Sequence, residues 1–435
     1  MVTLPTFALV GAGNRGGDVY GDYLLRHPDR GRLVALAERD AGRRELVADR
    51  HALATDMRFE SAEALLERPR IADVLIVATP DAHHAGAAVA GIERGYHVLL
   101  EKPMAPDAAG VTRIEAAARR HGASVSVAHV LRYTPFFRAI KRLLDAGAVG
   151  RLIDVAHVEH VGYWHFAHSY VRGNWRREDD ASPMILAKAC HDLDVLRWLI
   201  GAPCTKLASF GSLTHFVAAE APEGAAARCL DCSVERSCPY SARRIYLERF
   251  ASTDGWPITV LTDDPTIEGR LRALRTGPYG RCVYACDNDV ADHQVVAMSF
   301  ANGVSATLGV HAFSEANARS ITLSGTHGEL RGRLDESRIE WRDFVTGRCE
   351  IVDVLAKVTA LIGADDGVDR HEGGDDGLMR DLTDRLAITL AGGGPPTLAS
   401  SWEASLESHA MAFAAERARR HDLVVYLSEP DGHEI

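Results

Sequence analysis

The chain has 435 residues, more than one hydrophobic core usually supports, so its length predicts two domains. Its 60 acidic residues outnumber 49 basic ones, and the net charge of −11 argues against a nucleic acid or an anionic membrane as partner. No apolar stretch reaches about 18 residues and the N-terminus lacks a signal-peptide pattern, so we expect a cytoplasmic protein whose cysteines are thiols or metal ligands.

Residues 1–130 alternate short apolar runs with helical patterns. Apolar runs without polar alternation are typical of parallel strands buried on both faces, and their alternation with helices predicts a doubly wound parallel sheet. The expected strands cover residues 7–10, 32–37, 74–77, 98–100 and 125–130, and the expected helices cover 40–50, 61–66, 82–94 and 108–120.

The first predicted strand runs directly into Gly11-x-Gly13-x-x-Gly16 and then into a helical pattern. In this setting Gly11 permits a tight turn, Gly13 lets a pyrophosphate approach the backbone, and Gly16 lets the helix pack close to the strand. Glu38 ends the second strand, where a ribose-binding carboxylate belongs. The motif alone is weak evidence, but its context predicts a dinucleotide-binding Rossmann domain at residues 1–131.

From residue 132 onward the pattern changes to longer strands around one prominent helix at 183–200. Asn302-Gly303 between two apolar runs is a strong hairpin signal. We expect a substrate-binding and oligomerisation α+β domain at 132–435, with a large, mostly antiparallel open sheet and a cysteine-containing insertion at about 215–290. Its expected elements are helices at 134–146 and about 400–420, strands at 151–161, 293–300, 304–313, 321–323 and 328–334, and an exposed loop at 365–377.

Two lysines are candidates for chemistry in a chain that has few of them. Lys102 follows the strand at 98–100, and ligands bind at the carboxyl ends of such strands. Its ammonium is suited to stabilise an alkoxide; a surface lysine paired with Glu101 is the alternative. Lys188 shares a predicted helix face with His191, a residue suited to move protons, and Asp194 is spaced to orient that ring. A solvated helix face is the alternative here.

The segment 163–176 interleaves aromatic and polar residues, as carbohydrate sites do, although its aromatic residues would also suit a core. Clustering of Arg132, Arg172 and Arg176 would favour an anionic substituent, with a neutral polyhydroxy ligand as the alternative. The predicted substrate-binding residues are Arg132, Tyr133, His165, His168, Tyr170, Arg172, Trp175 and His191.

Cys229, Cys232 and Cys238 are closely spaced in a loop-like segment. In a reducing compartment such spacing suggests a structural Zn²⁺ with Cys282 as the preferred fourth ligand over Cys286. Unligated thiols are the alternative.

The glycine motif, Glu101-Lys102-Pro103 and the later His191-Asp192-x-Asp194 together resemble the Gfo/Idh/MocA oxidoreductases over nearly the whole chain. The resemblance implies a nicotinamide cofactor, with Lys102 matching the family's catalytic lysine and His191 its catalytic histidine. Many members carry an aspartate four residues before that histidine, where this chain has Ala187. The proton relay is therefore expected to run through Lys188 or Asp194.

The resemblance predicts hydride transfer between nicotinamide and a sugar, glycoside or cyclitol, with Lys102 and His191 in proton transfer. A redox-assisted glycoside hydrolase, which oxidises C3 transiently, eliminates, adds water and reduces again, is the alternative, with an acidic sugar glycoside among its candidate substrates. A catalytically silent sensor is less favoured because Lys102 and His191 are intact. We also expect a homodimer or homotetramer that forms through the C-terminal sheet.

Glu38 would repel a 2′-phosphate, so we expect NAD(H) to be preferred over NADP(H), with Arg39 as the counterargument. The predicted cofactor-binding residues are Gly11, Gly13, Asn14, Arg15, Gly16, Glu38, Arg39, Thr79, Pro80, His83, Glu101 and Lys102.

Overall fold

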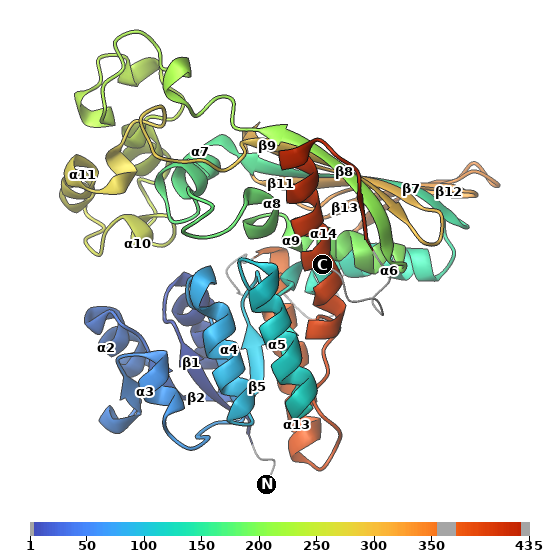
Figure 1. Ribbon diagram of the computed structural model, residues 1–435, viewed down its shortest axis with the longest axis horizontal. Coiled ribbons are helices and arrows are strands. Elements are labelled where there is room, and N and C mark those ends of the chain that lie inside the picture. Colours follow the sequence, from blue (N-terminus) through green and yellow to red (C-terminus); the bar gives the residue numbers. More distant parts are fainter. Residues whose placement is uncertain (1–3, 355–370, 428–435) are drawn as a thin grey trace.

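The computed structural model describes residues 4–354 and 371–427. Its N-terminal part contains a six-stranded, all-parallel sheet with the order β3-β2-β1-β4-β5-β6, in the lower half of Figure 1. This is the strand order of a dinucleotide-binding Rossmann fold, whose ligands lie at the carboxyl ends of the strands near β1 and β4. The strands are β1 (Thr6–Val10), β2 (Arg32–Ala37), β3 (Arg58–Phe59), β4 (Val74–Val77), β5 (His97–Leu100) and β6 (Val125–Val127).

Helices cover both faces of this sheet, and their starts follow from capping side chains. Asp107 accepts a hydrogen bond from the Gly110 N–H at the start of α5, which ends at Gly122 with a φ of +58°. The helices are η1 (Asn14–Gly21), α1 (Asp22–Arg26), α2 (Ala41–Arg50), α3 (Ala62–Leu66), α4 (His84–Glu93) and α5 (Ala108–His121). The predicted doubly wound sheet is therefore confirmed.

The second sheet has nine strands in the order β14-β13-β12-β11-β7-β10-β9-β8-β15. Only β7 and β10 pair in parallel, so the predicted mostly antiparallel sheet is also confirmed. The predicted hairpin joins β9 to β10, and Gly303 takes a φ of +84° there. The strands are β7 (Leu152–Gly162), β8 (Cys204–Ser212), β9 (His293–Phe300), β10 (Ser305–Ser314), β11 (Ala318–Gly325), β12 (Gly328–Arg333), β13 (Arg338–Asp343), β14 (Cys349–Asp353) and β15 (Val425–Tyr426).

The prominent helix expected at 183–200 is two helices, α8 (Met184–Ala187) and α9 (Cys190–Ile200). The chain leaves helical geometry at Ala189, where ψ is +7°. Lys188 therefore lies in the break, and the prediction that it shares one helix face with His191 is wrong. Periodicity across the segment gave no sign of the break because both halves are largely buried.

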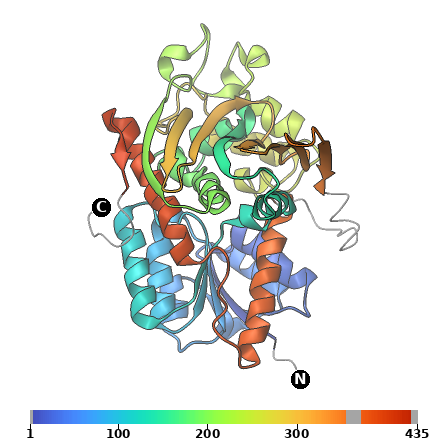
Figure 2. The same cartoon turned by 90° about the vertical axis from the view of Figure 1, so that its right-hand side faces the viewer.

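The loop expected at 365–377 is also partly wrong. Residues 365–370 lie outside the described residues, but η11 (His371–Gly373) and the start of α13 (Gly374–Leu390) follow, and Asp375 is only 1% exposed. The buried side of α13 packs on the Rossmann sheet beside η1 and α1, as Figure 2 shows. A segment far along the chain thus completes the N-terminal layer.

Between β8 and β9 the chain forms an insertion of short helices that projects at the upper left of Figure 1. Its helices are η6 (Ala218–Glu220), η7 (Cys229–Asp231), η8 (Glu235–Ser237), η9 (Arg244–Arg249), α10 (Ile258–Leu261), α11 (Ile267–Thr276) and η10 (Pro278–Gly280). The remaining helices near the second sheet are η4 (Val130–Tyr133), α6 (Pro135–Asp145), α7 (Tyr163–Phe166), η5 (Ala167–Arg172) and α14 (Trp402–His421).

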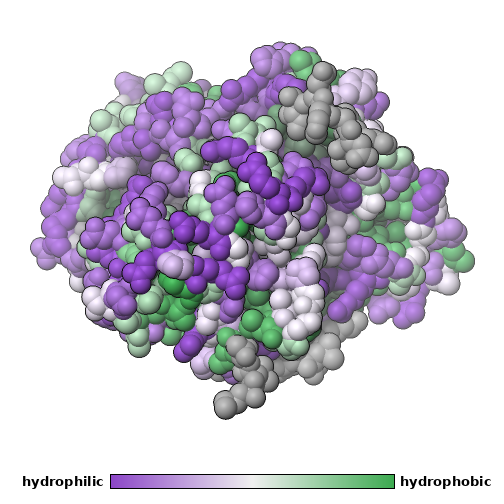
Figure 3. Space-filling model, turned by 60° about the horizontal axis from the view of Figure 1, so that its bottom comes forward, coloured by the Kyte–Doolittle hydropathy of each residue, from purple (hydrophilic) through white to green (hydrophobic). Residues whose placement is uncertain are grey.

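Helix α14 connects the two parts, since it contacts α5 and β6 at one end and β8 at the other (Figure 2). Its N-cap is Ser401, whose hydroxyl accepts from the Ala404 N–H, one residue beyond the predicted start. Hydrophilic residues dominate the face shown in Figure 3. In the described parts of the chain, no helix combines the length and apolarity that a membrane crossing requires.

If α13 is integral to the Rossmann layer, shortening its buried side chains will destabilise the fold. Leu382→Ala should lower the free energy of unfolding by about 2–5 kcal/mol, because Leu382 is 2% exposed and the cavity would not refill. Ile388→Ala on the same helix is the matched control, since Ile388 is 62% exposed. Urea denaturation measures both, and equal effects would contradict the packing.

Candidate functional site

The glycine loop has the geometry that a bound pyrophosphate requires. Gly11 has a φ of +87°, and a Cβ there would lie 2.6 Å from the Ala78 carbonyl oxygen. A Cβ on Gly16 would lie 1.9 Å from the Gly11 oxygen, so only glycine lets η1 approach β1 this closely. A Cβ on Gly13 would meet no atom within 4 Å, which leaves the backbone open to a ligand. The loop therefore fits a dinucleotide.

Two further groups lie where a nucleotide would bind. Glu38 directly follows β2 and accepts hydrogen bonds from the N–H groups of Ala12 at 2.7 Å and Asp40 at 3.0 Å. The hydroxyl of Thr79, which follows β4, is buried and has no hydrogen-bond partner among the described residues. Such an orphaned donor calls for a partner that a ligand can supply. Arg39 is exposed.

Other predicted cofactor residues differ in their surroundings. Asn14, Pro80 and His83 are exposed. The buried histidine is the neighbouring His84, whose ring nitrogens lie 2.7 Å from the carbonyl oxygens of Thr79 and Pro103. His84 thereby ties the loop after β4 to the loop after β5.

Arg15 makes only internal contacts among the described residues. Its guanidinium donates to Glu101 at 2.6 Å and forms a two-pronged contact with Asp375 at 3.0 and 2.7 Å. It also donates to the hydroxyl of Tyr20, which in turn donates to Glu101. Burial raises the pKa of Glu101, but Arg15 and Tyr20 offset this and bring it below its usual value. Glu101 is therefore ionised and forms an ion pair with Arg15.

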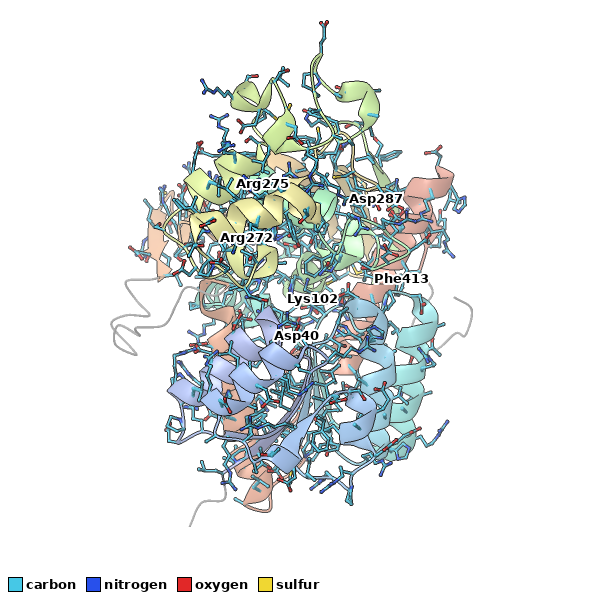
Figure 4. The ribbon with its side chains drawn as sticks, turned by 90° about the vertical axis from the view of Figure 1, so that its left-hand side faces the viewer. Asp40, Lys102, Arg272, Arg275, Asp287 and Phe413 are labelled. Atoms are coloured by element: carbon cyan, nitrogen blue, oxygen red, sulfur yellow. The ribbon has the colours of Figure 1, made fainter. Side chains whose placement is uncertain are left out.

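Lys102 reaches across the junction between the two parts of the molecule, where Figure 4 labels it. Its Nζ donates to the carbonyl oxygen of Ala187 at 2.7 Å, and its backbone N–H donates to the Glu101 carboxylate. The acceptor lies in the last turn of α8, where helix carbonyls lack intrahelical partners. The Lys102 ammonium is therefore not that of a surface lysine hydrogen-bonded to Glu101, because it binds Ala187 beside the second sheet instead.

His191 faces the same region from α9. It is 5% exposed, and its ring centroid lies 5.8 Å from that of His129 and 6.1 Å from that of His371. Its Nδ1 is buried and has no hydrogen-bond partner within residues 4–354 and 371–427. Burial lowers the pKa of His191 well below its usual value, and the Lys102 ammonium lowers it further. Both effects favour the neutral form of the ring.

A buried ion network lies beside these groups on β7, β11 and α9. Lys188 Nζ is 2.9 Å from Glu159, and Arg319 contacts both Glu159 at 2.7 Å and Asp192 at 2.8 Å. His157 Nε2 is 2.7 Å from Asp192. Burial raises the pKa of Asp192, but Arg319 and His157 reverse this and bring it below its usual value. The proton relay was predicted to run through Lys188, and the residue that Lys188 pairs with in the described structure is Glu159.

Asp194 does not contact His191. Its two oxygens accept from Arg132 Nε at 2.6 Å and Nη2 at 2.7 Å, and Arg132 also donates to the Ala399 carbonyl. The nearer histidine is His129, whose Nε2 lies 3.8 Å from Asp194. The buried hydroxyl groups of Tyr133 and Ser400 share a hydrogen bond nearby, and burial raises the pKa of Tyr133 to about 12. These residues anchor α9 to the segment before α14.

Of the segment 163–176, the structure brings His165 and Tyr170 toward the ion network. His165 contacts Asn317 and is close enough to Lys188 for that ammonium to add to the lowering of its pKa that burial causes. Burial raises the pKa of Tyr170, and the neighbouring Glu159 raises it further. Trp175 packs near Tyr170, with ring centroids 6.2 Å apart.

The remainder of that segment faces the insertion. His168 stacks on Tyr279 and lies 2.8 Å from the Tyr246 hydroxyl. Arg172 is 1% exposed and donates to the carbonyls of Arg281 and Tyr240. Arg176 binds Asp287, which lies above Lys102 in Figure 4. The expected cluster of Arg132, Arg172 and Arg176 around one ligand is therefore absent from the described structure.

Four cysteines of the insertion line one cavity of about 10 Å³ together with Arg172, whose Nη2 lies 3.4 Å from Cys229 Sγ; they are Cys229, Cys232, Cys238 and Cys282. Burial raises the pKa values of Cys238 and Cys282, which favours neutral thiols. In residues 4–354 and 371–427, no three His, Cys, Asp or Glu side chains are grouped so that they could hold a metal ion. The described residues therefore give no support to the zinc prediction at Cys229, Cys232, Cys238 and Cys282.

Sequence reasoning missed three residues of this region. Glu159 and Arg319 lie on paired strands whose alternation left a signal, since both are polar at inward positions. His371 was missed because nothing local marks it, and its partner Asp375 lay in a supposed loop.

Comparison with known proteins places this arrangement in a family. Residues 6–129 match the model of the Gfo/Idh/MocA oxidoreductase family with its NAD-binding Rossmann fold, and residues 137–229 match a Gfo/Idh/MocA C-terminal domain. The protein belongs to the Gfo/Idh/MocA oxidoreductase family.

Individual relatives are distant. The chain is 25% identical over 332 residues to the Bacillus subtilis protein YteT, covering 74% of this chain and 75% of YteT. It is 32% identical over 206 residues to inositol 2-dehydrogenase 4 of Saccharopolyspora erythraea, covering 45% of this chain and 54% of that protein, about half its length. A crystal structure of an Agrobacterium radiobacter oxidoreductase in complex with NAD⁺, L-tartaric acid and magnesium superposes with a TM-score of 0.68 at 16% identity, covering 98% of both chains, and shows the same fold.

The glycine loop provides a matched pair of variants. Gly16→Ala should lower the midpoint of thermal unfolding, because its Cβ would meet backbone and overpacking costs about 1–3 kcal/mol. Gly13→Ala should fold normally and weaken NADH binding, since its Cβ enters open space. Thermal unfolding and fluorescence titration with NADH separate the two effects. Unchanged NADH affinity in Gly13→Ala would contradict the site.

Proposed function

We propose that this protein transfers hydride between NAD(H) and a hydroxyl group of a sugar, glycoside or cyclitol. The observation that carries the proposal is the position of Lys102, two residues after β5: its ammonium binds the Ala187 carbonyl and is close enough to His191 to lower the pKa of that ring. The inositol dehydrogenase among its relatives supports the substrate class.

The glycine loop, Glu38 and Thr79 would hold the cofactor. The backbone at Gly13 is open to the pyrophosphate, and Glu38 lies where a ribose hydroxyl would donate to it. Bound NAD⁺ supplies the hydride acceptor.

Side chains of the protein would bind the reacting hydroxyl group and exchange its proton. An ammonium has three donors, of which Lys102 gives one to the Ala187 carbonyl, so others remain to bind a substrate oxygen and stabilise negative charge on it. His191 would exchange the proton with the substrate oxygen, and Lys188, the most exposed member of its ion network with Glu159 and Arg319, would bind a substrate hydroxyl.

A panel of inositols, aldoses and p-nitrophenyl glycosides with NAD⁺ tests the proposal. Net NADH formation, followed by absorbance, supports a dehydrogenase. Release of nitrophenol without net NADH supports the redox-neutral hydrolase that uses the same groups. Neither signal with any compound would contradict both and favour a sensor.

Lys102→Ala should lower kcat on the active panel compound by about 10²-fold, the usual loss for a positioned acid–base group, while the dissociation constant of NADH barely changes. Lys206→Ala is the matched control, because Lys206 is exposed on β8. Near-normal turnover in Lys102→Ala would refute its role.

Cofactor choice depends on the charge of Glu38. The wild type should bind NAD⁺ more tightly than NADP⁺. Glu38→Gln should bring the two dissociation constants closer together, because the amide still accepts from Ala12 but no longer repels a 2′-phosphate. Tighter binding of NADP⁺ by the wild type would overturn the preference.

We also propose self-association through the outer face of the second sheet. Phe210, Val295 and Phe313 are 62%, 43% and 44% exposed on adjacent strands of that face, and apolar side chains gathered in this way favour burial against a second copy.

A further inference from the structure

A histidine outside the predicted site faces His191. His371 lies in η11, and its proximity depresses the pKa values of both His191 and His165, though burial is the larger cause in each. The His371 side chain is 39% exposed, whereas His191 is 5% exposed. Of these two rings, His371 is the one that a substrate can reach.

Asp375 fixes the orientation of this ring. His371 Nδ1 lies 2.8 Å from Asp375 Oδ2, and a carboxylate accepts, so Nδ1 carries the hydrogen and Nε2 of the neutral ring is an acceptor. Asp375 is itself held by the Arg15 guanidinium. Within the described ranges, Nε2 has no hydrogen-bond partner. A histidine oriented by a carboxylate, with its second nitrogen available, is the arrangement of a general base.

The backbone around His371 is unusual. His371, Glu372 and Gly373 have φ values of +45°, +47° and +82°, a left-handed conformation that residues other than glycine rarely adopt. Glu372 lies close enough to Arg319 for the two charges to interact, so the turn contacts the ion network on the second sheet. Backbone outliers of this kind cluster at functional sites.

No carboxylate in the described part of the chain orients His191 in the same way. Asp194 is held by Arg132, Asp192 is held by Arg319 and His157, and position 187 is alanine. The carboxylate that would orient a catalytic histidine is therefore supplied to His371 instead, from the start of α13.

We propose that His371 is a substrate-contacting acid–base residue and that Asp375 is its positioning residue, an inference that rests on the proposed function. In oxidation the substrate O–H bond breaks and its proton passes to Nε2. The C–H bonding pair leaves with the hydrogen as hydride to the nicotinamide, and the O–H pair becomes the second bond of the carbonyl group. His371 ends as the imidazolium and returns the proton in the reverse reaction.

Variants at 371 test the role without disturbing the fold. Glycine suits a φ of +45°, so His371→Gly should fold, leave the NADH dissociation constant unchanged and lower kcat on the active panel compound by about 10²-fold. Added imidazole should restore part of the loss. His327→Gly is the matched control, since His327 is exposed in the turn between β11 and β12.

Asp375→Asn should lower kcat by about tenfold in the wild type and by less in the His371→Gly background, because part of its effect passes through His371 and the rest through Arg15. An equal loss in both backgrounds would show a merely structural role. If Asp375→Asn does not fold, His371→Gly and the labelling below decide the proposal.

Labelling with diethyl pyrocarbonate, mapped by peptide mass spectrometry, gives a readout other than turnover. His371 should react in the unliganded protein and be protected by NADH together with the active panel compound, while His327 reacts equally in both states. Turnover of His371→Gly within threefold of wild type, or no protection of His371, overturns the proposal and leaves the proposed function standing. A wild type that turns over no panel compound overturns both.

Discussion

The guanidinium of Arg15 is the contact on which the arrangement of the site depends. It joins the glycine loop to Glu101 at the end of β5 and to Asp375 at the start of α13. Buried charges are tolerated only in pairs, and removal of one partner of such a pair costs about 3–5 kcal/mol. Lys102 directly follows Glu101, and His371 contacts Asp375, so one guanidinium fixes both groups relative to the cofactor loop.

A second constraint fixes the opposite wall. Glu159 on β7 is the register partner of Arg319 on β11, and Asp192 meets the same guanidinium from α9. A slip of either strand by one residue would turn its own member of the pair to the outer face, so this register is required for the ion network to exist. With Lys188, two carboxylates face two cations, and Lys188, at 15% exposure, is the member nearest to solvent. Its ammonium is therefore the charge of this network that a ligand can reach most easily.

Local patterns were sufficient to predict the parallel sheet, its glycine loop and the main strands of the second sheet, because each depends on neighbouring residues. They were insufficient where partners are remote. Arg15 and Asp375 are 360 residues apart, so the first was predicted as a cofactor ligand and the second as part of a loop. Arg172 was placed at a ligand for the same reason, since the carbonyls that it binds lie in the insertion. At the break before α9, Lys188 likewise meets a partner that is remote in the sequence, Glu159.

The alanine at position 187 changes which groups of the site can take up a proton. Where the family resemblance places a carboxylate, this chain offers only the backbone oxygen of the last α8 turn, and Lys102 binds it. A carbonyl cannot take up a proton at neutral pH, so this contact positions the ammonium without entering the acid–base chemistry. The proton acceptor must then come from a titratable group that reaches the same space. Among the described titratable groups near this space, His371 combines solvent access with an orienting carboxylate, whereas His191 is buried and has no such carboxylate.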